Sequence, residues 1–100
     1  MLNKENLEQA VTCLKTLAHP TRLGILYVLR DGEKTVCELQ NLLNCSQSNI
    51  SQHLGIMRDR HILHARRDAN QVYYEVRNPS LFRLLEVLQD EFCQRAVSET

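Results

Sequence analysis

Five polar side chains gather within one short stretch of the sequence, and their chemistry would suit a contact with the base edges of DNA. They are hydroxyls and amides: Gln47, Ser48, Asn49, Ser51 and Gln52. Glutamine can form two hydrogen bonds with adenine, and serine can donate or accept one, so the set suits a contact inside a groove. A solvent-exposed helix face has the same composition, so this stretch alone does not separate the two interpretations.

Apolar residues in the same stretch indicate which way these side chains point. Ile50, Leu54 and Met57 recur at helical spacing, so they form one stripe and the polar residues face the opposite side. Ser46 precedes the stretch and is the expected N-cap. His53 lies beside the stripe; we keep it among the candidate DNA contacts, with a packed histidine bonded to the backbone as the alternative.

Arginines follow the polar stretch and could bind the phosphate backbone. Arg58 and Arg60 come directly after it, and Arg66 and Arg67 come a few residues later. Each could contact a phosphate, and an arginine near a hairpin tip could enter the minor groove. We take Arg58, Arg66 and Arg67 as candidate DNA contacts; a solvated surface charge is the alternative for each.

Four cysteines, at positions 13, 37, 45 and 93, are scattered without a CxxC pair, so neither a zinc ribbon nor a secreted disulfide framework is indicated. Cys37 is expected in the first turn of a helix, where free N–H groups and the helix dipole favour the thiolate that binds metalloids and reacts with oxidants. Cys37, Cys93 and Cys13 are the candidate sensor residues, able to hold a metal or metalloid. Cys45 is expected to pack against Ile50 as a hydrophobic staple, and a buried, purely structural cysteine is the alternative for the other three.

Four helices are expected to position these residues. The first runs along the apolar residues from Leu7 to Ala18 and ends at His19-Pro20, because the residue before proline avoids the helical region. The second spans 21–30, with Asp31-Gly32 as a left-handed stop. The third runs from Val36 to about Leu43 behind the capping box Thr35-Val36-Cys37-Glu38, and the fourth begins after Ser46.

The hydrophobic period changes to two from residue 62 onward. Leu63 and Ala65, then Val72, Tyr74 and Val76, alternate with polar residues around the turn at residues 68–70, which predicts a β-hairpin. Asn78-Pro79 is expected to cap and open a last helix whose apolar residues cover about 180°, more than the roughly 100° that one core requires. We expect the excess to meet a second subunit beside the first helix.

The predicted order, four helices, two strands and a helix (H-H-H-H-E-E-H), is that of a winged helix-turn-helix: a mainly α fold with a β-hairpin wing. We expect one such domain over residues 1–100, forming a homodimer through its first and last helices. In this arrangement the fourth helix enters the major groove of double-stranded DNA, and its N-terminal residues reach base edges.

Composition sets further bounds on function. The 43% hydrophobic and 24% charged residues describe an ordinary globular chain, and the start, Met1 to Gln9, is polar and acidic where a signal peptide would be basic and then apolar. We therefore expect a cytoplasmic protein without a membrane span. No Gly-rich phosphate loop, carboxylate pair or Cys–His pair has a workable spacing, so no enzyme is expected.

The net charge is zero, which by itself argues against a nucleic-acid partner. The charge is unevenly distributed, however: residues 46–77 carry five basic and three acidic side chains, and residues 78–100 carry two and four. The middle of the chain is therefore basic. A winged-helix module that binds protein instead of DNA is the alternative function.

Three stretches together resemble the arsenic-repressor (ArsR/SmtB) family of winged-helix regulators. They read LAHPTRL at 17–23, SQSNISQHL at 46–54 and RRDANQVYY at 66–74. The resemblance extends over nearly the whole chain. It implies a homodimeric DNA-binding repressor, an inverted-repeat operator, and release when an inducer binds or modifies the protein; a regulator that needs no ligand is the alternative.

The resemblance is weaker at the family's sensor sites. The thiolate site of the third helix looks like Cys-Val-Cys, and here it reads Thr35-Val36-Cys37; the site of the last helix uses Asp and His, and this last helix has no His. A reactive-sulfur subgroup pairs a cysteine of the second helix with one near the end of the last. Cys93 matches the latter, and Tyr27 stands at the former. The resemblance therefore leaves the inducer and any metal undetermined.

Overall fold

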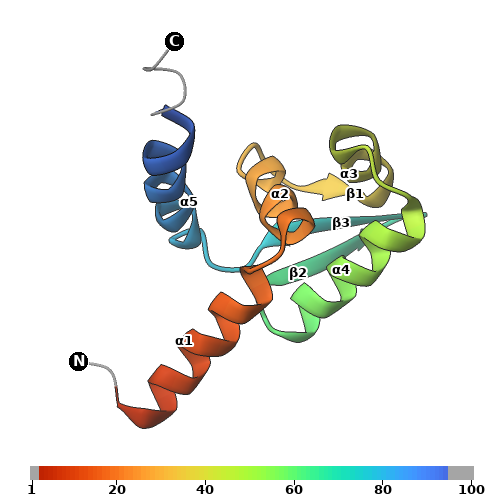
Figure 1. Ribbon diagram of the computed structural model, residues 1–100. Coiled ribbons are helices and arrows are strands. Elements are labelled where there is room, and N and C mark those ends of the chain that lie inside the picture. The colour runs from red at the N-terminus through yellow and green to blue at the C-terminus, as the bar shows by residue number, and fades with distance from the viewer. Residues whose placement is uncertain (1–2, 95–100) are drawn as a thin grey trace.

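The computed structural model describes residues 3–94, and its elements follow the predicted order (Figure 1). The chain runs through α1 (Lys4–Leu17), α2 (Pro20–Leu29), β1 (Lys34–Thr35), α3 (Val36–Leu43), α4 (Gln47–Asp59), β2 (Leu63–Asp68), β3 (Gln71–Val76) and α5 (Leu81–Gln89). A π-helical turn, η1 (Asp90–Gln94), continues α5. The winged helix-turn-helix prediction is confirmed.

The hairpin is part of a three-stranded antiparallel sheet in the order β1-β3-β2. Within the hairpin, Leu63 pairs with Val76 at the base and Asp68 pairs with Gln71 at the tip. The strand β1 was not predicted, because two residues are too short to show a period. Its Lys34 pairs with Tyr74 of β3. Only the base of the hairpin is buried, so the tip projects as a wing.

Side-chain caps fix where α3 and α4 begin. Thr35 Oγ1 accepts a hydrogen bond from the Glu38 N–H at 3.2 Å, and Glu38 Oε1 accepts one from the Thr35 N–H at 3.0 Å, which confirms the capping box. Asn44 turns the chain with a φ of 54°, and Ser46 then caps α4 by accepting from the Asn49 N–H at 3.2 Å. The tight turn between α3 and α4 thus follows from local chemistry.

The last helix begins later than predicted. Asn78 does not cap it directly: its Oδ1 accepts from the N–H of Ser80 at 3.1 Å. The next backbone bonds join residues three apart, beginning with the Leu81 N–H to the Asn78 carbonyl at 3.0 Å, so a tight turn precedes the α-helix proper.

The core lies where α2, α3 and α4 meet the base of the sheet. The predicted stripe Ile50, Leu54 and Met57 has no solvent exposure. The buried apolar residues are Leu17, Ile25, Leu26, Leu29, Leu39, Ile50, Leu54, Met57, Ile62, Leu63, Val76 and Leu85. Of these buried residues, α1 contributes Leu17 alone and α5 contributes Leu85 alone, so these two helices lie at the periphery of the core.

Both outer helices leave large apolar side chains exposed. On α1 they are Leu7, Val11 and Leu14. On α5 the exposed residue is Val87, and on the turn η1 that continues it the exposed residue is Phe92; each of the five is at least 45% exposed. Figure 1 shows α1 and α5 on the side of the molecule away from α3. Apolar surface in excess of one core was predicted for α5, and the structure shows it on both helices.

Within residues 3–94, no helix is long and apolar enough to cross a membrane.

Candidate nucleic-acid interface

The outer face of α4 carries the polar residues predicted to reach DNA. These five side chains are all exposed: Gln47, Ser48, Asn49, Ser51 and Gln52. They lie on the first turn and a half after the Ser46 cap, and the buried stripe holds the opposite face of the helix against the core. The helix therefore offers hydroxyl and amide groups to solvent from a backbone fixed by packing.

His53 does not belong to this face, although we included it among the candidate contacts. The side chain is buried, with 7% of the residue exposed, and its ring lies 4.5 Å from that of His19, centroid to centroid. His53 Nδ1 accepts a hydrogen bond from Arg22 Nε at 3.1 Å, so its partner is a guanidinium and not the backbone. Burial lowers the pKa of His53, and the nearby His19 and Arg22 lower it further. A neutral, packed histidine cannot reach a groove.

Arg66 is exposed, and three neighbours surround its guanidinium. Its guanidinium forms a two-pronged ion pair with Glu33, with Nε to Oε2 at 3.2 Å, and lies 4.7 Å from the centre of the Tyr73 ring. Asp68 adds a carboxylate 3.7 Å from the guanidinium. The pair with Arg66 also lowers the pKa of Glu33. Arg66 therefore joins the wing to the loop before β1, and a phosphate would have to compete with Glu33 for its guanidinium.

The two other candidate arginines are freer. Arg67 is exposed on β2, where its backbone pairs with Val72, and its side chain has no partner among the described residues. Arg58 is exposed near the end of α4, where Asp59 lies 3.6 Å from its guanidinium. An exposed pair at that distance is weak, so both arginines can bind a phosphate. Arg60 instead turns inward and donates to the Thr16 hydroxyl at 3.1 Å.

A small hollow of about 230 Å³ joins the start of α4 to the wing and the start of α3. Gln47 lines it from α4, Gln71 and Val72 line it from β3, and Thr35, Val36 and Cys37 line it from the first turn of α3. The exposed Cys37 thiol thus lies in the same hollow as the first residue of the polar face.

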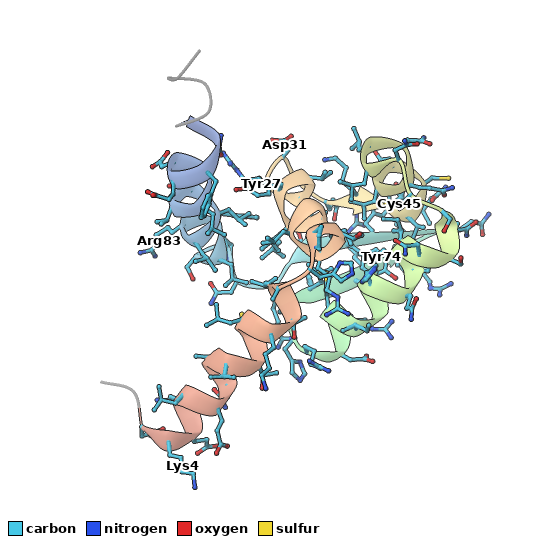
Figure 2. The ribbon with its side chains drawn as sticks, viewed as in Figure 1. Lys4, Tyr27, Asp31, Cys45, Tyr74 and Arg83 are labelled. Carbon is cyan, nitrogen blue, oxygen red and sulfur yellow. The ribbon has the colours of Figure 1, made fainter. Side chains whose placement is uncertain are left out.

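Cys13 and Cys45 are less accessible than Cys37. Cys13 is half-buried on α1, and burial raises the pKa of its thiol. Cys45 is half-buried where α3 meets α4 (Figure 2), and its Sγ donates to the Leu43 carbonyl at 3.4 Å, in keeping with a packing role. Cys93 falls in η1, but its side chain lies outside the described part of the structure.

Two further observations concern the sensor arrangements weighed above. Among the side chains of residues 3–92, no three His, Cys, Asp or Glu gather so as to hold a metal ion. Tyr27, which stands where the reactive-sulfur subgroup has its cysteine, donates from its hydroxyl to the Leu85 carbonyl at 3.0 Å (Figure 2). That position ties α2 to α5 in this chain.

Two residues that hold this interface in place were not predicted from the sequence. Glu33 fixes the wing through Arg66, and Arg22 holds α4 through His53. These partners are 33 and 31 residues apart in the chain, so no spacing pattern joins them. The one available signal was the charge of Arg22 within an otherwise apolar helix.

Sequence comparison identifies regulators as the relatives of this chain. The profile of the bacterial regulatory protein, arsR family, matches residues 19–64. The biofilm growth-associated repressor of Agrobacterium fabrum is 40% identical over 92 residues, which covers 92% of this chain and 78% of the relative. The transcriptional activator HlyU of Vibrio cholerae is 36% identical over 91 residues, covering 91% and 84%.

Solved structures give the same result. The transcriptional repressor BigR from Xylella fastidiosa superposes with a TM-score of 0.80 at 32% identity, covering 92% of this chain and 98% of that one. A homodimeric winged helix-turn-helix DNA-binding domain from Mycobacterium bovis superposes with a TM-score of 0.78 at 28% identity, covering 89% and 85%. The whole described fold is therefore shared with regulators.

Proposed function

Because this chain belongs to the ArsR family of bacterial regulatory proteins, we propose that it is a homodimeric repressor that leaves an inverted-repeat operator when an inducer acts on its cysteines. The family and the relatives found here are DNA-binding transcriptional regulators and not enzymes. The homodimer, the operator, the direction of regulation and the action of an inducer on cysteine are proposals.

The exposed polar face of α4 carries the proposal. A major groove about 12 Å wide admits a helix, and the exposed amides and hydroxyls of α4 could then form hydrogen bonds with base edges. In the proposed complex Gln52 and Ser51 contact base edges, and Arg58 and Arg67 contact phosphates. The burial of the opposite face of α4 favours this mode, because the helix can dock without the fold opening.

The exposed apolar faces of α1 and α5 support a homodimer. A two-fold pairing of these helices would bury the leucines and valine of α1 together with Val87 and Phe92. The solved relative from Mycobacterium bovis is described as homodimeric. Such a dimer would place its two α4 helices in successive major grooves, about 34 Å apart.

A mobility shift on the promoter upstream of the protein's own gene tests the DNA-binding part. We expect a saturable shift that Gln52→Ala weakens and that Gln9→Ala, an exposed glutamine of α1, does not. Absence of a shift at low salt would support the protein-binding module instead. A reporter that rises when the gene is deleted would support repression, and one that falls would assign activation, as in the name of the Vibrio relative.

Cys37 is the residue on which we base the inducer hypothesis. Its thiol is exposed in the hollow that Gln47 and the wing also line, so a bound metalloid or an oxidised sulfur there would lie beside the polar face. Cys13 and Cys93, on the helices of the proposed dimer, are the other candidates. A thiolate-bound metal or metalloid, an oxidant and a reactive sulfur species all remain within the proposal.

Repeating the mobility shift with arsenite, zinc, cadmium, peroxide and persulfide tests this part. We expect at least one of them to release the wild-type protein, Cys37→Ser to reduce that release, and Cys45→Ala to leave it unchanged. Unaltered release from a variant in which Cys37 and Cys93 are both serine would refute the cysteine hypothesis.

A further inference from the structure

The first helix is attached to the rest of the protein only near its end. Along α1 most side chains are exposed, and the buried ones are Thr16 and Leu17 in the last turn. Figure 1 shows α1 projecting away from the body of the molecule. The direction of α1 relative to the other helices is therefore set in the last part of α1, by Thr16 and Leu17 together with the half-buried Cys13.

Thr16 is a buried polar residue whose two oxygens both bind arginine. The residue has no solvent exposure. Its backbone carbonyl accepts a hydrogen bond from the guanidinium of Arg22 at 3.2 Å, and its Oγ1 accepts one from the guanidinium of Arg60 at 3.1 Å. The hydroxyl in turn donates to the Thr12 carbonyl at 2.7 Å, which orients it toward Arg60.

Both arginines connect Thr16 to α4. Arg22 uses its Nε to donate to His53 in the middle of α4, and Arg60 is the C-cap residue of the same helix. Residues 53 and 60 are about two turns, or roughly 10 Å, apart along a helix axis. A single attachment would let α4 pivot relative to α1, whereas two attachments at this separation oppose rotation.

We propose that Thr16 is a positioning residue that sets the angle between α1 and α4 through Arg22 and Arg60. This inference rests on the proposed function, in which α1 lies at the dimer interface and α4 lies in the groove. The angle then determines how far apart the two α4 helices of a dimer lie. Thr16 therefore selects the operator half-site spacing that the dimer fits, without touching DNA.

The chain offers a matched set of variants. Thr16→Val keeps the shape and the backbone carbonyl of the residue and removes the hydroxyl that Arg60 needs. Thr16→Ser restores the hydroxyl. Arg60→Gln replaces the guanidinium that donates to the Thr16 hydroxyl with a shorter amide. Because Arg60 is exposed, this variant tests the same hydrogen bond without altering a buried position. Thr12→Val makes the same threonine-to-valine change at an exposed position of α1, where only the backbone carbonyl is used.

The assay compares operators that differ in spacing. Affinity is measured for the operator found by the promoter shift and for versions with one base pair added or removed between the half-sites. Loss of stability alone would weaken binding to all three DNAs alike, whereas a change of angle alters the ratio between them. Sedimentation and thermal unfolding confirm that each variant is folded and dimeric.

We expect Thr16→Val and Arg60→Gln to reduce the preference for the natural spacing by about tenfold, which is the lower end of what a hydrogen bond to a charged group contributes. Thr16→Ser and Thr12→Val should keep the wild-type ratio. If the wild type binds its operator and the ratio is the same in Thr16→Val and Arg60→Gln, the inference is wrong and the proposed function stands. If the wild type binds no DNA, both are refuted.

Discussion

Truncating Leu14 to alanine should weaken the proposed dimer without harming the subunit. Leu14 is 55% exposed on the outer face of α1, so the core makes little use of it. Fully burying a leucine side chain is worth roughly 1.5–3 kcal/mol, and about half of that remains to be gained when a partner covers this one. A symmetric dimer contains the residue twice, so the loss is again roughly 1.5–3 kcal/mol per dimer.

That free energy corresponds to a dimer dissociation constant raised by about 10- to 150-fold. Sedimentation equilibrium over a range of protein concentrations measures it directly. Leu42→Ala is the matched control, because Leu42 is 60% exposed but lies on α3, away from α1 and α5. It should change the dissociation constant by no more than about twofold.

Two results would refute the reasoning. A wild-type protein that sediments as a monomer at micromolar concentration would remove the interface altogether. Equal dissociation constants for Leu14→Ala and the wild type, with Leu42→Ala weakened instead, would move the interface to α3.

Three further predictions concern α4, the wing and the buried histidine. Gln52→Ala should weaken operator binding by roughly 5- to 150-fold in fluorescence anisotropy, with the free energy of unfolding unchanged within about 0.5 kcal/mol because the residue is exposed. In Arg67→Ala, the slope of log operator affinity against log salt concentration should become shallower by the equivalent of about one phosphate contact per subunit. In Arg66→Ala the slope should be unchanged, because Glu33 already neutralises Arg66. Folding lowers the pKa of His53 below its ordinary value of 6.5, so the unfolded chain binds more protons than the folded chain at acidic pH. The free energy of unfolding should therefore fall as the pH drops below about 6.5. Urea unfolding at pH 7.5 and 5.5 measures this loss, which should be smaller in His53→Asn.

Local chemistry explains how much of the fold could be predicted from the sequence. Thr35 and Ser46 are hydrogen-bonded to groups three residues away, so the starts of α3 and α4 are visible in a few letters. The stripe of Ile50 and Leu54 is visible in the period of one helix. By contrast, β1 is two residues long, and the delayed start of α5 depends on a tight turn after Asn78 that no period reveals.

In the candidate site, too, local features were predicted and features that depend on tertiary contacts were not. Exposure of the α4 residues followed from the helical period, because their positions are fixed by neighbours in the same helix. The environments of His53 and Arg66 could not be predicted in this way, because each depends on a side chain about thirty residues away in the sequence. Arg66 and Arg67 look alike in sequence, yet alternate residues of a strand face opposite sides, and Glu33 lies on one side only. Which arginine is free is thus a property of the tertiary fold.

The zero net charge and the paired Arg66 have a consequence for how this protein would bind DNA. With Arg58 and Arg67 as the weakly engaged cations of the interface, phosphate contacts alone supply little affinity in the proposed complex. The remainder must come from the amides and hydroxyls of α4, which act only when the helix lies deep in the groove. One subunit offers a small set of such contacts, whereas a dimer of correct spacing doubles them within a single binding event. In the proposed complex, dimerisation and the angle of α4 therefore determine how many of these contacts form together.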